Sequence, residues 1–501
     1  MATMTSARIL LVSIKHRWLP VLAMLAVTLI SGCAVNPVSG QREIVLMTES
    51  QEIAIGRQNH PEIIARFGLY DDPELQQYVT DVGERLAAKS HRAGLVYRFT
   101  VLDSTDVNAF ALPGGYIYIT RGLLAYLNSE AEMAAVLGHE IGHVTARHSV
   151  RQQTAATAAG FGYTIASILV PELGYAQVQD IYGLLSNALL SGYGREHELE
   201  ADRLGADYLA RTGADPEAML SVISVLKNQD DFFRQQAEAE GREHQGYHGL
   251  FATHPDNDTR LQQMIQQATL TPATEQIDDN RETFLNQIDG MVFGDNVQQG
   301  IRRGQDFYHP DMDFGLHFPD TWVIKNRPDR LIAIAPQGSA QIQIQADDIN
   351  RRIPPEEFMV KRLGLKRLQQ GQPLDIKGLE GYTGLTEMNT AKGPRVGRVS
   401  VVYLKNRAFI FSGVALNQSS AAQADEVFLA TAMSLHQLTR EERRLAKPLR
   451  IKVIKAKKNS RYSEMAKRSP IDSYAELQLR LINNQYPNGE PTAGSLVKII
   501  Q

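Results

Sequence analysis

The segment His139-Glu140-Ile141-Gly142-His143 constrains this chain more than any other feature, because it sets two histidines four residues apart around a glutamate. Upstream, Ser129-Glu130-Ala131-Glu132 resembles a capping-box start, which predicts that a helix carries the motif. Apolar side chains then recur at helical spacing, at Met133, Val136, Leu137, Ile141 and Val144. Histidines four apart lie one above the other on a helix, so both imidazoles can bind one tetrahedral Zn²⁺ at about 2.0–2.1 Å. The alternative is a surface helix that carries two histidines by coincidence.

A catalytic zinc site needs a third protein ligand and an open position for water. The metzincin pattern H-E-x-x-H-x-x-G-x-x-H requires glycine at 146 and histidine at 149, where this chain has Ala146 and Ser149, so that class is excluded. The segment 195–202 offers acidic side chains instead and begins another strongly helical stretch. The candidate third ligands in this segment are Glu196, Glu198 and Glu200.

The segment Arg195-Glu196-His197-Glu198-Leu199-Glu200-Ala201-Asp202, taken with the histidine motif, resembles the gluzincin family of HtpX and the CAAX prenyl protease. The resemblance is strongest to its periplasmic branch, that of the β-barrel assembly-enhancing proteases. The family uses a Glu-x-x-x-Asp helix, and Glu198 and Asp202 match it. The resemblance therefore implies that Glu198 binds zinc and that Asp202, one turn later, orients a ligand histidine or handles a proton.

Two further segments resemble the family. Residues 108–124 (Asn-Ala-Phe-Ala-Leu-Pro-Gly-Gly-Tyr-Ile-Tyr-Ile-Thr-Arg-Gly-Leu-Leu) match the part before the zinc helix, where a strand beside the metal could pair with an extended substrate. An ordinary core hairpin is the alternative. The segment 253–260 carries His254, which can approach the metal or the reaction oxyanion, and Arg260, which can stabilise developing negative charge. If His254 occupies the open zinc position, the enzyme is latent until substrate displaces it.

The resemblance implies a zinc metalloendopeptidase, a hydrolase that holds one Zn²⁺ per chain. The implied metal ligands are His139, His143 and Glu198, and the implied catalytic residues are Glu140 as general base, Asp202, His254 and Arg260. Three other histidines have no comparable context and are expected at the surface: His148, His244 and His248.

The N-terminus has the pattern of an export signal. Arg8, Lys15 and Arg17 precede an apolar stretch of 12 residues from Leu19 to Ile30. The stretch ends in Ile30-Ser31-Gly32-Cys33, which resembles a bacterial lipobox and contains the chain's single cysteine. We therefore predict a lipoprotein signal peptide over 1–32, acylation of Cys33, and a position on the periplasmic face of the envelope. Ala34 rather than aspartate follows the cysteine, which favours the outer membrane.

The remaining pattern predicts an α+β protein. A mainly helical zincin-type metalloprotease domain is expected over 33–280, a β-rich α+β domain over 285–438, and a small tail over 449–501 that is similar to a LysM-like module. The apolar run from Ala155 to Val170 has 16 residues, too few to span a bilayer. In the sheet domain we predict strands over 331–336, 340–346, 399–404 and 408–414.

Charge separates the tail from the rest of the chain. The formal net charge is −4, which gives no reason to expect nucleic-acid binding, and it becomes −7 once the three basic groups of residues 1–32 are removed. Between Arg440 and Arg468, however, twelve Lys and Arg residues stand against three Glu. We therefore expect contact with peptidoglycan or another anionic envelope polymer, with a solvated basic surface as the alternative.

The sequence leaves three functions open. The first is lipid-anchored proteolysis of misfolded or unassembled envelope proteins, where the quality-control role comes from the family resemblance. The second is an assembly chaperone or scaffold whose protease site is normally closed. The third is hydrolysis of a non-peptide envelope bond. All three are compatible with the same predicted metal site, so tests on unfolded protein, glycan and lipid substrates must separate them.

Overall fold

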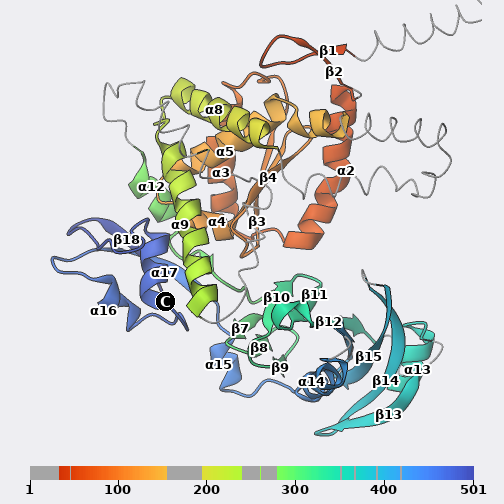
Figure 1. Cartoon of the computed structure of the whole chain (residues 1–501). Coiled ribbons are helices and arrows are strands. Elements are labelled where there is room, and N and C mark those ends of the chain that lie inside the picture. The colour runs from red at the N-terminus through yellow and green to blue at the C-terminus, as the bar shows by residue number, and fades with distance from the viewer. Residues whose placement is uncertain are drawn as a thin grey trace, which may run out of the picture.

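The structure is a computed structural model that describes residues 33–45, 47–154, 194–239, 260, 279–349, 353–365, 368–390, 393–417 and 420–501. Helices dominate the described residues up to 239, and a seven-stranded antiparallel sheet dominates those after 300 (Figure 1). The predicted α+β class is confirmed. Among the described helices, none has the length and apolarity needed to cross a bilayer. The expected signal peptide, the run from Ala155 to Val170 and residues 253–259 lie outside the described residues.

The first region packs helices around a small sheet. Its strands are β1 (Cys33–Val35), β2 (Arg42–Ile44), β3 (Arg98–Leu102), β4 (Ala109–Leu112) and β5 (Tyr116–Thr120). Its helices are α2 (Glu49–Phe67), α3 (Pro73–Ala87), α4 (Arg121–Tyr126), α5 (Glu130–Thr145), α8 (Arg195–Thr212), α9 (Ala218–Ala239) and α12 (Arg281–Gln287). The strand order is β3-β5-β4, with β3 parallel and β4 antiparallel to β5. Strand β4 is thus an edge of this sheet within the described residues.

The turn between β4 and β5 explains the glycine pair that the sequence places there. Gly114 and Gly115 both have positive φ, of 81° and 87°. A Cβ on Gly114 would also lie 2.5 Å from the Cα of Ile53 in α2. Glycine is therefore required both by the backbone conformation and by the close approach of α2.

The second region is built on the sheet β10-β11-β12-β16-β15-β14-β13. Its strands are β10 (Val323–Arg327), β11 (Arg330–Ile334), β12 (Ala340–Asp348), β13 (Gln369–Ile376), β14 (Leu379–Thr390), β15 (Gly393–Leu404) and β16 (Arg407–Ala415). A smaller sheet contains β7 (Ile301–Arg303), β8 (Asp306–His309) and β9 (Phe314–His317), and the helices are α13 (Pro355–Lys361) and α14 (Ala421–Met433), with a 3-10 turn η2 (Pro336–Gly338). Helix α14 packs on the large sheet, where Phe428 lies in the same core as Phe409 and Trp322.

The tail packs against the first region. Helix α15 (Glu442–Leu445) leads to β17 (Leu449–Lys455), α16 (Tyr462–Ala466), α17 (Ala475–Ile482) and β18 (Leu496–Ile500). Strand β17 pairs with β18 and also with β6 (Val292–Phe293). Figure 1 shows α17 beside α9, where the hydroxyl of Tyr486 donates a hydrogen bond to Gln235 at 2.9 Å. The predicted domain boundaries stay predictions, but one hydrophobic core contains side chains from both the helical region and the tail.

A buried lysine ties the tail to the start of the histidine-bearing helix. The ammonium of Lys498 in β18 donates hydrogen bonds to the carbonyl oxygens of Ala125 and Leu127, at 2.8 and 2.6 Å. Ala125 lies in the last turn of α4, and Leu127 lies directly after it, in the segment that leads to α5. Burial lowers the pKa of Lys498 well below its ordinary value. The tail therefore positions the chain that leads into α5.

This shared core predicts that a tail substitution weakens α5. Leu479→Ala removes a side chain with 0% exposure and is expected to cost about 2–5 kcal/mol of unfolding free energy. Because α17 and α5 share one core, hydrogen exchange of the α5 amides should accelerate by the factor that corresponds to this loss of unfolding free energy. The control is Leu445→Ala, at a side chain 45% exposed, with an expected change within about 0.5 kcal/mol. A destabilised tail with unchanged exchange in α5 would show that the two parts unfold independently.

Candidate metal centre

The helix that carries the histidine motif is α5, and its N-terminus follows the sequence prediction. The side chain of Ser129 accepts a hydrogen bond from the backbone amide of Glu132 at 3.1 Å, which caps the first turn. The carboxylate of Glu132 accepts from the amide of Asn128 at 2.6 Å, in place of the Ser129 amide that a full capping box would use. Almost every residue of α5 is buried, including both histidines.

Helix α8 supplies the acidic side chains. Glu198 and Asp202 lie one turn apart, and both are fully buried. Glu196, two residues before Glu198, is exposed to solvent. The helix ends at Gly213, whose φ of 77° gives the left-handed conformation common after a helix. Thus α8 buries the pair Glu198 and Asp202 and exposes Glu196.

Glycines allow α5 and α8 to approach closely. A Cβ on Gly142 would lie 2.9 Å from the carbonyl oxygen of Ala201, and one on Gly205 would lie 2.9 Å from the backbone nitrogen of His139. Gly138 faces Gly205, with a Cβ position 3.3 Å from its Cα. Any larger side chain at Gly142 or Gly205 would push the helices apart. The short helix separation brings the histidines of α5 to the carboxylates of α8.

Gly142→Val is therefore expected to lower the free energy of unfolding by about 1–3 kcal/mol and to weaken zinc binding. The added side chain clashes with the backbone of Ala201 and moves Glu198 away from the histidines. Urea unfolding and zinc titration measure the two effects. Gly194→Ala is the control, because nothing lies within 4 Å of a Cβ there. Zinc affinity equal to that of the unmodified chain would show that the separation of α5 and α8 does not set the site.

Three side chains converge between the two helices. The Nε2 atoms of His139 and His143 lie 2.9 Å apart. They lie 3.5 and 3.4 Å, respectively, from the two carboxylate oxygens of Glu198. These separations are near the edge of about 3.3 Å between ligands in a tetrahedral zinc site. His139, His143 and Glu198 therefore form a buried group that could hold a metal ion.

The hydrogen-bond pattern supports the same conclusion. Nδ1 of His139 lies 2.8 Å from a carboxylate oxygen of Asp202, which can only accept, so Nδ1 carries the proton. In the neutral ring, Nε2 of His139 then presents a lone pair toward Nε2 of His143 and toward Glu198. Electron-rich atoms that face one another in this way favour a bound cation.

Asp202 is held by Arg260. The guanidinium donates two hydrogen bonds to its carboxylate, each at 2.7 Å, and lies 3.3 Å from Glu198. Burial alone would raise the pKa of Asp202, but the charge and hydrogen bonds of Arg260 and the bond from His139 lower it far below its ordinary value. Asp202 therefore stays ionised and fixes the orientation of His139.

The general-base candidate Glu140 is buried on α5 beside His139. Its negative charge is one of those that raise the pKa of Arg260 above its ordinary value, after Asp202 and Glu198 and against the effect of burial. Glu140, Glu198 and Asp202 thus share one cationic neighbour. His254, predicted to act at the same site, lies outside the described residues, whereas Arg260 is described and buried.

The comparisons with known proteins address this region. Residues 73–268 match the model of peptidase family M48. The predicted metallopeptidase class is thereby confirmed for residues 73–268. These residues contain α5, α8 and all three candidate ligands.

Among curated proteins, the β-barrel assembly-enhancing protease of Yersinia pestis is 32% identical over 219 residues, and that of Escherichia coli K12 is 30% identical over 219 residues. The mitochondrial metalloendopeptidase OMA1 of Arabidopsis thaliana is 34% identical over 157 residues, or 31% of each chain. The two bacterial matches cover 42% of this chain and 42% of each relative, so the chain spans about two fifths of their length.

One solved structure, the cyanobacterial PsbP of Synechocystis sp. PCC 6803, is 12% identical with a TM-score of 0.22. It covers 30% of this chain and 98% of its own. A likeness at this level carries no conclusion about function.

Beside the three candidate ligands, the structure places residues that the sequence analysis did not assign to the site. His148 was expected at the surface, and this prediction is wrong: its side chain is fully buried against His143. Glu200, a candidate ligand by sequence, instead binds His148 and Arg151, at 3.0 and 2.9 Å. His244 and His248 lie outside the described residues.

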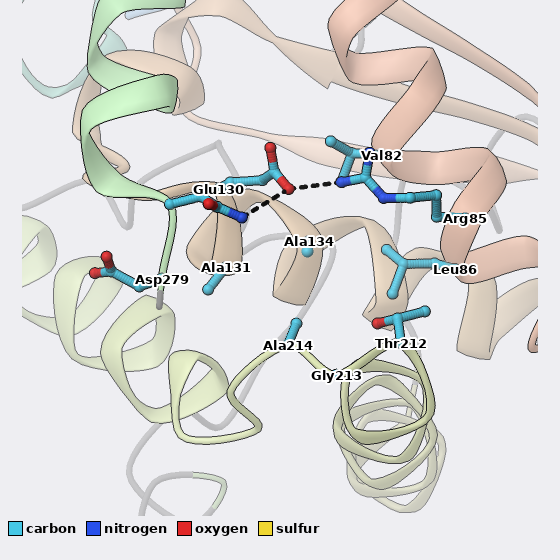
Figure 2. A pocket seen from close by; sticks show the side chains of 11 residues that line it. Val82, Arg85, Leu86, Glu130, Ala131, Ala134, Thr212, Gly213, Ala214 and Asp279 are labelled. Atoms are coloured by element: carbon cyan, nitrogen blue, oxygen red, sulfur yellow. Dashed lines mark hydrogen bonds and ion pairs between the residues drawn. The ribbon is translucent and has the colours of Figure 1, made fainter. Parts of the chain in front are cut away.

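A cavity of about 320 Å³ lies at the opposite end of α5. Figure 2 shows Arg85 of α3 and Glu130 of α5 paired above it, with Ala131 and Ala134 of α5 and Ala214 after α8 forming its apolar wall. The Arg85–Glu130 ion pair measures 2.6 Å. None of the three candidate metal ligands lines this cavity. It is therefore separate from the metal site, and we assign it no ligand.

Proposed function

We propose that this chain is a zinc-dependent endopeptidase of the bacterial cell envelope that holds one Zn²⁺ per chain. The observation that carries the proposal is the convergence of two imidazole nitrogens and one carboxylate between α5 and α8, with Glu140 beside them. His139, His143 and Glu198 would hold the metal. When bound, zinc polarises a carbonyl and lowers the pKa of water.

The chain's own residues then have distinct roles. Glu140 would take a proton from the attacking water and return it to the leaving amine. Asp202 would hold His139 through its Nδ1 hydrogen bond. Arg260 was proposed from the family resemblance to stabilise developing charge. Arg260 donates hydrogen bonds to Asp202 and forms an ion pair with Glu198. These contacts favour a role in which Arg260 mainly holds the two carboxylates in place. His254 remains a candidate gate.

The substrate is proposed to bind in extended form. Strand β4 is paired only with β5 in the described sheet, so no other strand among the described residues occupies its second edge. Strand β4 lies in the segment 108–124 that precedes the zinc helix. An extended peptide added to this edge would have its backbone oriented by hydrogen bonds independently of its sequence. Such recognition suits unfolded proteins as substrates.

The cellular setting is proposed from the N-terminal signal pattern and from the relatives. Two of them are named β-barrel assembly-enhancing proteases, which favours misfolded or unassembled envelope proteins as substrates. Acylation of Cys33 would anchor the chain to the membrane, in the outer membrane by the lipobox pattern. Exposed basic side chains support contact of the tail with an anionic envelope polymer such as peptidoglycan; they are Lys455, Lys457, Lys458, Arg461, Lys467 and Arg468.

Cleavage of an unfolded protein such as casein tests the proposal. The purified chain should cleave it, lose this activity when a chelator removes the metal, and recover it when zinc is restored. A chaperone or scaffold with a closed site would prevent aggregation of the unfolded protein and leave it intact. Hydrolysis of glycan or lipid without any cleavage of casein would contradict proteolysis and support hydrolysis of a non-peptide envelope bond.

A further inference from the structure

The chain reverses direction directly after the zinc helix. Helix α5 ends at Thr145, and Arg147 has a φ of 56°, in the left-handed region. The side chain of Arg147 is fixed by hydrogen bonds to Glu52, at 2.6 Å, and to the carbonyl oxygen of Met47, at 2.7 Å. The next helical segment begins at His148. This turn returns the ring of His148 to the side of α5 that carries His143.

His148 is fully buried and contacts the candidate ligand His143. The Nδ1 atoms of the two rings lie 2.8 Å apart, and the rings meet at 72°. On its other side, Nε2 of His148 lies 3.0 Å from a carboxylate oxygen of Glu200. The ring of His197 stacks on His148, with centroids 4.3 Å apart. Contacts on several sides fix the position of this imidazole.

One arrangement of protons satisfies all of these contacts. Glu200 is ionised and accepts, so Nε2 of His148 donates to it. Nδ1 of neutral His148 then accepts the hydrogen bond that Nδ1 of His143 donates. Nε2 of His143 is left with its lone pair, directed at Nε2 of His139 and at Glu198. The chain of contacts thus selects the tautomer of His143 that can bind a metal.

Glu200 is itself fixed by a cation. Arg151, on the helical segment that begins at His148, donates a hydrogen bond to the same Glu200 oxygen at 2.9 Å. The guanidinium of Arg151 also lies 3.7 Å from Glu43 in β2. The carboxylate therefore accepts from two donors, the neutral ring of His148 toward the site and the charged guanidinium of Arg151 toward the surface.

We propose that His148 and Glu200 are positioning residues for the metal ligand His143. His139 is oriented directly by a carboxylate, Asp202, whereas His143 is oriented by the carboxylate of Glu200 through one intervening imidazole. Both ligand rings are thereby held in the tautomer that presents Nε2 to the metal. This inference rests on the proposed zinc site, and it adds two residues that neither bind the metal nor contact the substrate.

The test is the dissociation constant of zinc, measured by competition with a chromogenic chelator. His148→Ala should weaken zinc binding by about 10–100-fold, because partners of ligand histidines commonly contribute this much. His148→Asn should recover most of the loss, since its side-chain oxygen can still accept from Nδ1 of His143. Glu200→Gln, which keeps an acceptor for His148, should lose less than Glu200→Ala. His309→Ala removes another buried histidine, in β8 of the second region, and should leave the constant unchanged.

Circular dichroism of each metal-free variant identifies any that fail to fold. If an alanine variant fails to fold, the zinc affinities of His148→Asn and Glu200→Gln are compared with that of the unmodified chain instead. Zinc affinity of folded His148→Ala equal to that of the unmodified chain would overturn the inference while leaving the zinc site intact. An equal loss of zinc affinity in His148→Ala, His148→Asn and His309→Ala would also overturn the inference, because general destabilisation would then explain the loss. If the unmodified chain binds no zinc, the proposed function itself fails.

Discussion

Glu140→Gln is expected to lower kcat for peptide hydrolysis by about 10²–10⁴-fold while zinc content stays at the level of the unmodified chain. The amide has nearly the shape of the carboxylate but cannot take a proton from water. Glu140 is buried beside the ligands and does not belong to the group that could hold the metal. Loss of the base should therefore affect the chemical step and leave the metal in place.

Steady-state cleavage of a quenched casein substrate, with elemental analysis of the same samples, measures both quantities. Glu130→Gln is the matched control, because it makes the same change on the same helix at a residue that pairs with Arg85 away from the site. Its kcat should stay within about twofold, as expected when a partly exposed ion pair is lost. Activity retained in Glu140→Gln would assign the base to another residue.

Glu198→Ala is expected to reduce peptide hydrolysis to background and to weaken zinc binding by more than about 100-fold. It removes one of three protein ligands, a larger loss than that of a residue that only orients a ligand. It also removes the carboxylate that lies 3.3 Å from the guanidinium of Arg260. Zinc competition and casein cleavage report the two effects.

The control for this prediction is Glu196→Ala, two residues earlier on α8 at an exposed position. It should keep the affinity and the activity of the unmodified chain. The pair also decides between the candidate ligands that the sequence left open. Loss of zinc in Glu196→Ala, with none in Glu198→Ala, would identify Glu196 as the third ligand. That result would contradict the site geometry between α5 and α8.

Periodic features of the fold could be predicted from the sequence. The cap at Ser129 and the apolar spacing of α5 are local patterns, and the structure places the helix where they predict it. Strands β11, β12 and β16 likewise begin and end within two residues of the predicted ranges. Strand β15 begins six residues before the predicted start, at Gly393. Strands β13 and β14 are not predicted from the sequence, because the largely exposed β13 and the irregular burial along β14 lack the alternation that marks a half-buried strand.

Contacts made across the fold could not be predicted in the same way. His148 has no motif spacing that reveals burial, since its position depends on the left-handed turn at Arg147 and on Glu200 arriving from α8. The packing of the tail against the first region also depends on tertiary contacts, such as the burial of Lys498 against the carbonyl groups of Ala125 and Leu127. Such pairings join residues far apart in sequence, so composition and periodicity do not encode them locally.

The zinc content of the purified chain, measured by elemental analysis after exhaustive dialysis, tests the central claim most directly. We expect one zinc ion per chain. Protein that is folded and carries no metal, and that takes up none from added zinc, would contradict the account.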